Sequence, residues 1–133
     1  MEKNNLPNII AVFPLSNFIL FPKTSVPLNI FEPRYVEMIN DSIKLNKFIG
    51  MIQPLSSNNN EKLNPKLHKI GCLGKITSFK ETENASFLIE LQGLIRFETI
   101  NEIESDKKYR QYKVSFENFE NDLIDQREKL KFT

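Results

Sequence analysis

Four prolines divide residues 9–35 into short apolar pieces, and their spacing limits what this segment can form. They are Pro14, Pro22, Pro27 and Pro33, and the residues between them are rich in Val, Ile, Leu and Phe. Proline fixes φ and has no backbone N–H, so it occupies strand ends, edge strands or the first turn of a helix. The spacing therefore predicts short strands near residues 9–15 and 26–30, and no run here reaches the length of a membrane span.

The clearest helix signal begins at Pro33. Proline is favoured at the first helical position, where its missing N–H costs nothing, and Glu32 suits the positive end of the helix dipole. Tyr35, Ile39 and Ile43 then recur at helical spacing. The sequence predicts one amphipathic helix over about residues 33–45.

The remaining apolar segments have the length and alternation of β-strands. Strands are expected at residues 48–52, 70–80, 87–92, 94–104 and 111–116. Gly93 is expected to break or bend the chain. The polar residues 56–69 are expected to form a surface loop, and residues 122–131 the first turns of a helix. Tight turns between the later strands favour antiparallel pairing, so the predicted fold class is α+β and mainly β.

Composition excludes several classes of protein. The chain has 133 residues, about one domain, and its 18 basic and 17 acidic residues argue against general binding to nucleic acid. Cys72 is the single cysteine, so no internal disulfide can form and a reducing compartment is expected. The N-terminus leads to no apolar run typical of a signal peptide, so the predicted location is the cytoplasm.

The residues for common catalytic and metal chemistry are missing or isolated. The four glycines build no phosphate-binding loop, and His68, the only histidine, lies in the polar segment. Cys72 stands inside a predicted strand without a nearby base, which favours a buried core residue over a nucleophile. We therefore predict no catalytic residues, no metal site and no cofactor.

One cluster of basic and aromatic residues leaves two interpretations open. It consists of Lys107, Lys108, Tyr109, Arg110, Tyr112 and Lys113. Such a mixture can bind single-stranded nucleic acid, but a strand with one hydrated face has the same composition. The nearly neutral charge of the chain favours the second interpretation.

Several short motifs occur in an order that resembles the N-terminal, substrate-binding domain of Lon-type ATP-dependent proteases. The matching residues are 12–15 (Val-Phe-Pro-Leu), 20–22 (Leu-Phe-Pro), 26–35 (Val-Pro-Leu-Asn-Ile-Phe-Glu-Pro-Arg-Tyr), 49–51 (Ile-Gly-Met), 70–76 (Ile-Gly-Cys-Leu-Gly-Lys-Ile), 91–97 (Leu-Gln-Gly-Leu-Ile-Arg-Phe) and 109–110 (Tyr-Arg). Residues 30–35 and 93–97 look closer to stand-alone Lon-domain proteins than to full proteases.

The resemblance implies a fold and a domain boundary. The implied fold is a PUA-like twisted antiparallel β pseudobarrel with one packed α-helix. The Lon-like domain would span residues 6–121. Residues 122–133 would begin a C-terminal helix or tail, which is either truncated here or minimal.

The resemblance also implies a function. We expect a non-catalytic protein-recognition module that binds unfolded or specific protein segments, because no ATPase or Ser/Lys protease module accompanies it in the sequence. Its partners would be protein or peptide segments, including a protease or its substrates, with no membrane, and nucleic acid is the less favoured partner. The oligomeric state is left open. PUA-like folds elsewhere bind RNA, so an RNA-binding module is the alternative function.

Four residues are the candidates for the binding surface. Phe18, Phe21 and Phe31 are expected to line an apolar groove or a sheet edge, and Arg34 to contact the bound chain. Each has a structural alternative, since the three rings could belong to the core and Arg34 could stabilise the fold.

Overall fold

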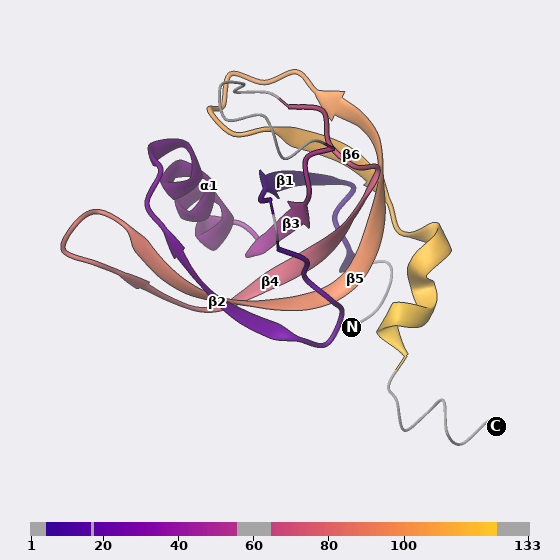
Figure 1. Cartoon of the computed structure of the whole chain (residues 1–133), viewed down its shortest axis with the longest axis horizontal. Helices are drawn as coiled ribbons and strands as arrows, with labels where there is room; N and C mark the ends of the chain where they lie inside the picture. Colours follow the sequence, from indigo (N-terminus) through magenta and orange to yellow (C-terminus); the bar gives the residue numbers. More distant parts are fainter. Residues whose placement is uncertain (1–4, 17, 56–64, 125–133) are drawn as a thin grey trace.

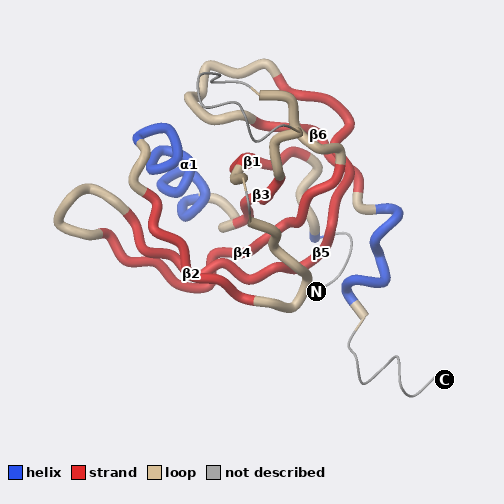
Figure 2. Tube along the Cα trace, viewed as in Figure 1, coloured by secondary structure: helices blue, strands red, loops and turns tan. Residues whose placement is uncertain are grey.

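One six-stranded sheet with an α-helix beside it makes up most of the structure (Figures 1 and 2). The computed structural model describes residues 5–16, 18–55 and 65–124. In chain order the elements are β1 (Ile9–Pro14), β2 (Ser25–Ile30), α1 (Pro33–Lys44), β3 (Phe48–Ile52), β4 (Ile70–Glu81), β5 (Phe87–Ile103), β6 (Gln111–Ser115) and the 3₁₀-helix η2 (Glu117–Leu123).

The sheet closes on itself because β5 is long enough to pair with three other strands. Neighbouring strands follow the order β2-β5-β4-β3-β1-β6, and β6 pairs again with β5. The first part of β5, residues 87–92, pairs with β2, whereas residues 98–103 pair with β6. Five strands thus form a barrel and β2 extends it, which confirms the predicted pseudobarrel.

The pairings are antiparallel apart from that of β1 with β3, which is parallel. Val12, Phe13 and Pro14 of β1 lie opposite Gly50, Met51 and Ile52 of β3. Parallel neighbours need a long crossover connection, and here β2 and α1 provide it. Tight turns between consecutive strands gave no indication of this pair, because the two strands are far apart in sequence.

The helix α1 begins at Pro33, as predicted, and ends at Lys44, one residue before the predicted end. Its buried residues are Tyr35, Met38, Ile39 and Ser42. Ile43, which was expected on this face, is only partly buried. The Tyr35 ring packs against the Phe13 ring with 4.4 Å between centroids, so the helix is fixed to β1.

Side chains on one face of β5 contribute to two separate hydrophobic clusters. Phe87, Ile89 and Leu91 join the cluster that includes the helix, whereas Ile95 and Phe97 join the cluster inside the barrel. The change occurs around Gly93. Leu73 and Gly74 pair with Ile95 and Gly93, so Leu94 is the extra residue of a β-bulge. The strand therefore bends at the predicted position but continues through it.

Two predicted segments differ from the structure or extend outside the described residues. A helix was expected from Asp122 onward, whereas the structure has the 3₁₀-helix Glu117–Leu123, and residues 125–133 are not among those described. Of the predicted loop 56–69, residues 65–69 are described. Leu67 there forms an isolated β-bridge with Pro54.

Candidate functional site

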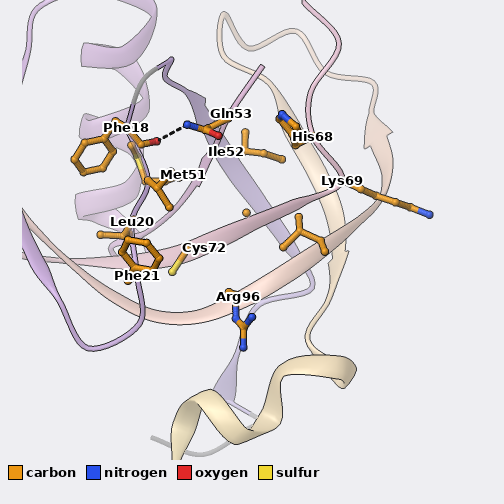
Figure 3. Close-up of a pocket in the computed structure, with 13 residues that line it drawn as sticks. Phe18, Leu20, Phe21, Met51, Ile52, Gln53, His68, Lys69, Cys72 and Arg96 are labelled. Carbon is orange, nitrogen blue, oxygen red and sulfur yellow. Dashed lines mark hydrogen bonds between the residues drawn. The ribbon is translucent and has the colours of Figure 1, made fainter. Parts of the chain in front are cut away.

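An apolar cavity of about 420 Å³ lies between residues 18–21 and the adjoining parts of β3 and β4 (Figure 3). One wall is the run Phe18, Ile19, Leu20 and Phe21. The opposite wall comes from Met51, Ile52 and Gln53 at the end of β3 and from Ile70, Gly71 and Cys72 at the start of β4. His68, Lys69 and Arg96 complete the lining, so long-range folding assembles the cavity from four parts of the chain.

Contacts to its backbone and the burial of Leu20 hold the segment 18–21, while Ile19 and Phe21 are exposed. The Nε2 of Gln53 donates to the carbonyl oxygen of Phe18 at 3.2 Å, as Figure 3 shows. Leu20 is buried in the core and anchors the segment, whereas Ile19 and Phe21 are 58% and 59% exposed. A firmly positioned backbone therefore presents apolar side chains at the cavity.

A tight turn fixes the end of this wall. Lys23 has a positive φ of 67°, and the amide and hydroxyl groups of Thr24 both donate to the carbonyl oxygen of Phe21, at 3.2 and 2.7 Å. The turn is attached to β5, because the N–H of Lys23 donates to Gly93 and the N–H of Gly93 donates to Thr24, each at 2.8 Å. The bend in β5 therefore positions the cavity wall.

The charged groups at the cavity are basic. None of the described residues that line it is an Asp or a Glu. Lys69 lies 3.4 Å from the carboxylate of Glu98, and both side chains are substantially exposed. Arg96 makes a two-point contact with Asp122, with Nε–Oδ2 at 3.0 Å and Nη2–Oδ1 at 2.8 Å. This hydrogen bonding raises the pKa of Arg96.

Cys72 is a buried core residue, as predicted, and only 3% of it is exposed. Burial raises the pKa of its thiol from 9.0 to about 12. Nucleophilic chemistry needs the thiolate, which is scarce at neutral pH when the pKa is this high. The cysteine therefore contributes apolar surface to the cavity.

The four predicted binding residues occupy two different cavities. Phe18 and Phe21 line the cavity described above. Phe31 and Arg34 line a second cavity of about 200 Å³ between the ends of β1 and β2 and the start of α1. Phe21 and Phe31 are more than half exposed, so the alternative that they are core residues is wrong. Phe18 is partly buried and packs against the core.

Arg34 has contacts within its own helix turn. Its Nε lies 3.5 Å from the carboxylate of Glu32, and its guanidinium lies over the Tyr35 ring, 4.7 Å from the centroid. These contacts are consistent with the structural alternative, in which Arg34 stabilises the fold. Its role in binding at the second cavity stays a prediction.

Sequence reasoning missed several lining residues. Met51 and Gln53 carried no signal that would place them beside residues 18–21, because the connection is made only in the folded chain. Arg96 could have been identified. It is a charged residue on the outward face of an alternating strand, within one of the motifs that carry the family resemblance.

The basic and aromatic cluster at residues 107–113 is largely engaged in contacts within the protein. Tyr109 is 6% exposed and donates to Asp41 at 2.6 Å. Arg110 donates to both carboxylate oxygens of Glu102 and to the hydroxyl of Tyr112. These hydrogen bonds explain why the pKa of Asp41 and that of Glu102 are both lowered. The Tyr109 ring is thus buried, and the hydroxyl of the partly buried Tyr112 is engaged.

The described residues offer neither a grouped set of metal ligands nor a membrane-spanning helix. Within residues 5–16, 18–55 and 65–124, no three His, Cys, Asp or Glu side chains are grouped so that they could hold a metal ion. In the same ranges, no helix has the length and apolar character needed to cross a membrane.

Comparison with known proteins gives consistent results. The profile of the "ATP-dependent protease La (LON) substrate-binding domain" matches residues 9–132. A Lon protease of Flavobacterium johnsoniae is 28% identical over 109 residues, which cover 82% of this chain and 13% of that protein. A Lon protease of Desulfosudis oleivorans is 30% identical over 104 residues, covering 77% of this chain and 13% of that protein. The chain thus spans 13% of the length of these relatives.

Solved structures share the fold. A Lon N-terminal domain protein from Xanthomonas campestris has a TM-score of 0.64 at 22% identity, with 81% of this chain and 59% of that chain covered. The N-terminal domain of a Lon protease from the Mycobacterium avium complex has a TM-score of 0.63 at 12% identity, with 81% and 54% covered.

Proposed function

The chain belongs to the family of LON substrate-binding domains, and on that premise we propose that it is a non-catalytic module that binds protein segments with exposed apolar side chains. The apolar cavity beside residues 18–21 is the observation that carries the proposal. Its occupant would be a side chain of an unfolded or specific partner segment, such as a substrate of a Lon-type protease or a part of the protease itself.

The chemistry of the lining supports an apolar occupant. Burying one large apolar side chain contributes about 1.5–3 kcal/mol, so a single anchor gives weak binding and several give useful affinity. Met51 is flexible and polarisable, and can adapt to side chains of different shapes. Such a site tolerates many sequences, as a module that recognises unfolded chains requires.

A groove is better supported than a sheet edge as the binding surface. The outer strand of the sheet is β2, and Pro27 lies in its middle. Proline has no N–H to donate to an added strand, and it is one of the devices that protect edge strands from pairing. Main-chain pairing with a bound segment would therefore be interrupted at β2.

A non-catalytic role is supported by the protonation state and the placement of the reactive groups. Cys72 remains a thiol at neutral pH. ATP hydrolysis and peptide cleavage are activities of whole Lon proteases, of whose length the chain spans 13% in the two relatives described above. We propose that the domain contributes recognition alone, in the cytoplasm, where a single reduced cysteine is usual.

The RNA-binding alternative has less support. It relied on Tyr109, Arg110 and Tyr112, which have the internal partners described above. The exposed Lys108 and Lys113 remain, and two lysines give little phosphate affinity at moderate salt. A mobility-shift assay at low salt with micromolar protein tests this alternative directly.

Removal of single rings tests the proposed function. The assay is fluorescence anisotropy with a labelled peptide that carries Phe and Leu in a Gly/Ser background. Phe21→Ala should weaken binding by about fivefold or more, because it removes an anchor contact, and should change the free energy of unfolding by less than about 1 kcal/mol at this exposed site. Phe18→Ala should weaken binding too, with a larger loss of stability because Phe18 is partly buried.

Phe79→Ala is the matched control. Phe79 is 46% exposed on β4 and lies outside the cavity. Binding should stay within about twofold of the unmodified protein. Equal losses in Phe21→Ala and Phe79→Ala, or no binding to the unmodified protein, would refute the cavity as the site.

A further inference from the structure

Arg96 connects the cavity to the segment that follows the barrel. We call residues 117–124, which contain η2, the C-terminal strap. Arg96 lines the cavity, as Figure 3 shows. Its guanidinium forms two hydrogen bonds with Asp122 and lies over the Phe119 ring, 4.8 Å from the centroid. The backbone N–H of Arg96 also donates to Asp122, at 2.9 Å. One side chain therefore faces both the cavity and the strap.

The strap has little structure of its own to hold it in place. η2 has seven residues, none of them buried, no side-chain cap at its start, and a non-helical Phe119 in its interior. Phe119 and Leu123 are partly buried against the barrel cluster. Segments with few buried contacts and exposed hydrogen bonds open at low free-energy cost.

A second contact joins the strap to the other wall of the cavity. The Nζ of Lys23 donates to the carbonyl oxygen of Ile124, and Lys23 belongs to the turn that ends residues 18–21. The strap is thus attached through Asp122 to Arg96, which lines the cavity, and through Ile124 to Lys23, which adjoins its wall.

The charges around the cavity favour an occupant with a carboxylate. Arg96 and Lys69 are the cations among the lining residues, which include no carboxylate. Arg96 is held by Asp122, whereas the Lys69 side chain is 74% exposed. A carboxylate next to a bound apolar side chain would reach a guanidinium whose present partner, Asp122, comes from the strap and not from the barrel.

We propose that Arg96 recognises a carboxylate that adjoins the bound apolar side chain by exchanging Asp122 for it, so that binding of an acidic apolar segment releases the C-terminal strap. The inference rests on the proposed function, since it names the class of segment that the cavity accepts. The preferred ligand is a large apolar residue directly followed by Asp or Glu.

The exchange is close to balanced in free energy. One two-point carboxylate–guanidinium contact replaces another, and the freed carboxylate of Asp122, whose side chain is 9% exposed, regains its hydration. Water can replace its bond to the exposed backbone N–H of Arg96. The ligand and Asp122 compete for Arg96, and such coupling is reciprocal. If the acidic ligand weakens the contact of the strap with Arg96, then a weaker Asp122 contact must tighten binding of that ligand by the same factor.

Two peptides and two variants test the coupling. The labelled peptides share a Gly/Ser background and carry Phe-Asp or Phe-Asn, and anisotropy is measured at low ionic strength, where charge contacts are least screened. Asp122→Asn should tighten the Phe-Asp peptide by about fivefold or more and change the Phe-Asn peptide by less than about twofold. Thermal melting of each variant confirms that it is folded.

Glu117→Gln is the matched control, because it removes one exposed carboxylate of the strap, outside the lining, and leaves Asp122 in place. It should change either affinity by less than about twofold. An equal effect of the two variants, or equal tightening of both peptides by Asp122→Asn, overturns the exchange while leaving the apolar site in place. Failure of both peptides to bind overturns the proposed function and this inference together.

Fluorescence gives an independent readout of the strap. The chain has no Trp, so Phe119→Trp places a single Trp, which can be excited selectively over the three Tyr, against Arg96. The Phe-Asp peptide should shift its emission toward that of a solvated Trp, and the Phe-Asn peptide should not. The same shift with both peptides would show that the strap does not respond to the carboxylate, and would overturn the proposal.

Discussion

The carbonyl oxygen of Phe21 lies directly against Gly93, only 2.1 Å from the position that a Cβ on residue 93 would occupy. Residue 93 must therefore be glycine for a backbone reason, although its φ is not in the left-handed region. The contact lets the turn at residues 21–24 exchange hydrogen bonds with β5. It links the bend in the longest strand to the wall of the binding cavity.

Gly93→Ala should consequently weaken binding of the apolar peptide by more than the loss of folding stability explains. The added methyl group meets backbone atoms, which cannot rotate away as a side chain can, so residues 20–24 must move. We expect a loss of at least about 1–3 kcal/mol in the free energy of unfolding, measured by denaturant titration. The folded fraction should also bind the apolar peptide about fivefold more weakly or worse.

Gly74→Ala provides the matched comparison, since Gly74 is the strand partner of Gly93. A Cβ there would meet atoms of the Leu91 side chain, the nearest at 2.7 Å, and the cost falls on core packing. Stability should fall while the affinity of the folded protein stays the same. Equal loss of affinity in both variants would contradict the link between Gly93 and the cavity.

The hydrogen bond from Tyr109 to Asp41 should give the protein a specific dependence on acid pH. This bond is the main reason that the pKa of Asp41 is below its ordinary 3.8. A lowered carboxyl pKa contributes stability above the unfolded value, and the contribution is lost as the pH falls through the folded value. Tyr109→Phe should cost about 1 kcal/mol at neutral pH, since Asp41 is partly exposed.

That cost should begin to shrink as the pH falls below 3.8 and should be lost as it falls through the lowered pKa of Asp41 in the folded protein. Denaturant titrations of the unmodified protein, Tyr109→Phe, Asp41→Asn and the double variant isolate the pairwise free energy. A pairwise free energy that stayed constant from neutral to acid pH would show that the Asp41 charge is not responsible.

Cys72 should react slowly with thiol reagents in the native protein. Its thiol is buried and its pKa is about 12, so the reactive thiolate is scarce at neutral and mildly alkaline pH. With an aromatic disulfide reagent, the native rate should rise steadily with pH and show no plateau near 9. The denatured protein should react about 100-fold faster or more at pH values near 8, and its rate should level off above 9. A native plateau near 9 would contradict the burial effect.

Phe31→Ala should separate the roles of the two cavities. Phe31 is 68% exposed, so the free energy of unfolding should change by less than about 0.5 kcal/mol. Binding of a short peptide that fills the first cavity should be unaffected. A long unfolded chain can also contact the second cavity. Once its first contact has formed, the second is intramolecular and adds to the affinity. Loss of the Phe31 ring removes this addition, so the long chain should bind the variant more weakly.

Leu45→Ala is the control for this experiment, because Leu45 is 82% exposed and lines neither of the two cavities. Equal loss of affinity for long and short ligands in Phe31→Ala would indicate a general effect on the domain and not a second contact point.

Features that depend on neighbouring residues could be read from the sequence. The start of α1 at Pro33 follows from the fixed φ of proline and from the helical spacing of Tyr35 and Ile39. The alternation over residues 87–92 predicted a strand, and Phe87, Ile89 and Leu91 are its buried positions. The ordered motifs identified the family, because they record the whole fold and not one site.

Features that depend on distant residues were decided only by the tertiary structure. The parallel pairing of β1 with β3 and the closure of the barrel between β5 and β6 follow from packing across the chain. The predicted binding rings were separated into two cavities for the same reason, since Phe18 and Phe31 are close in sequence but lie on either side of the turn and β2. Local propensity fixes φ, ψ and the buried face of each element, whereas a site forms where elements meet. The contacts of Phe21 with Gly93 and of Arg96 with Asp122 exist only after the barrel has closed.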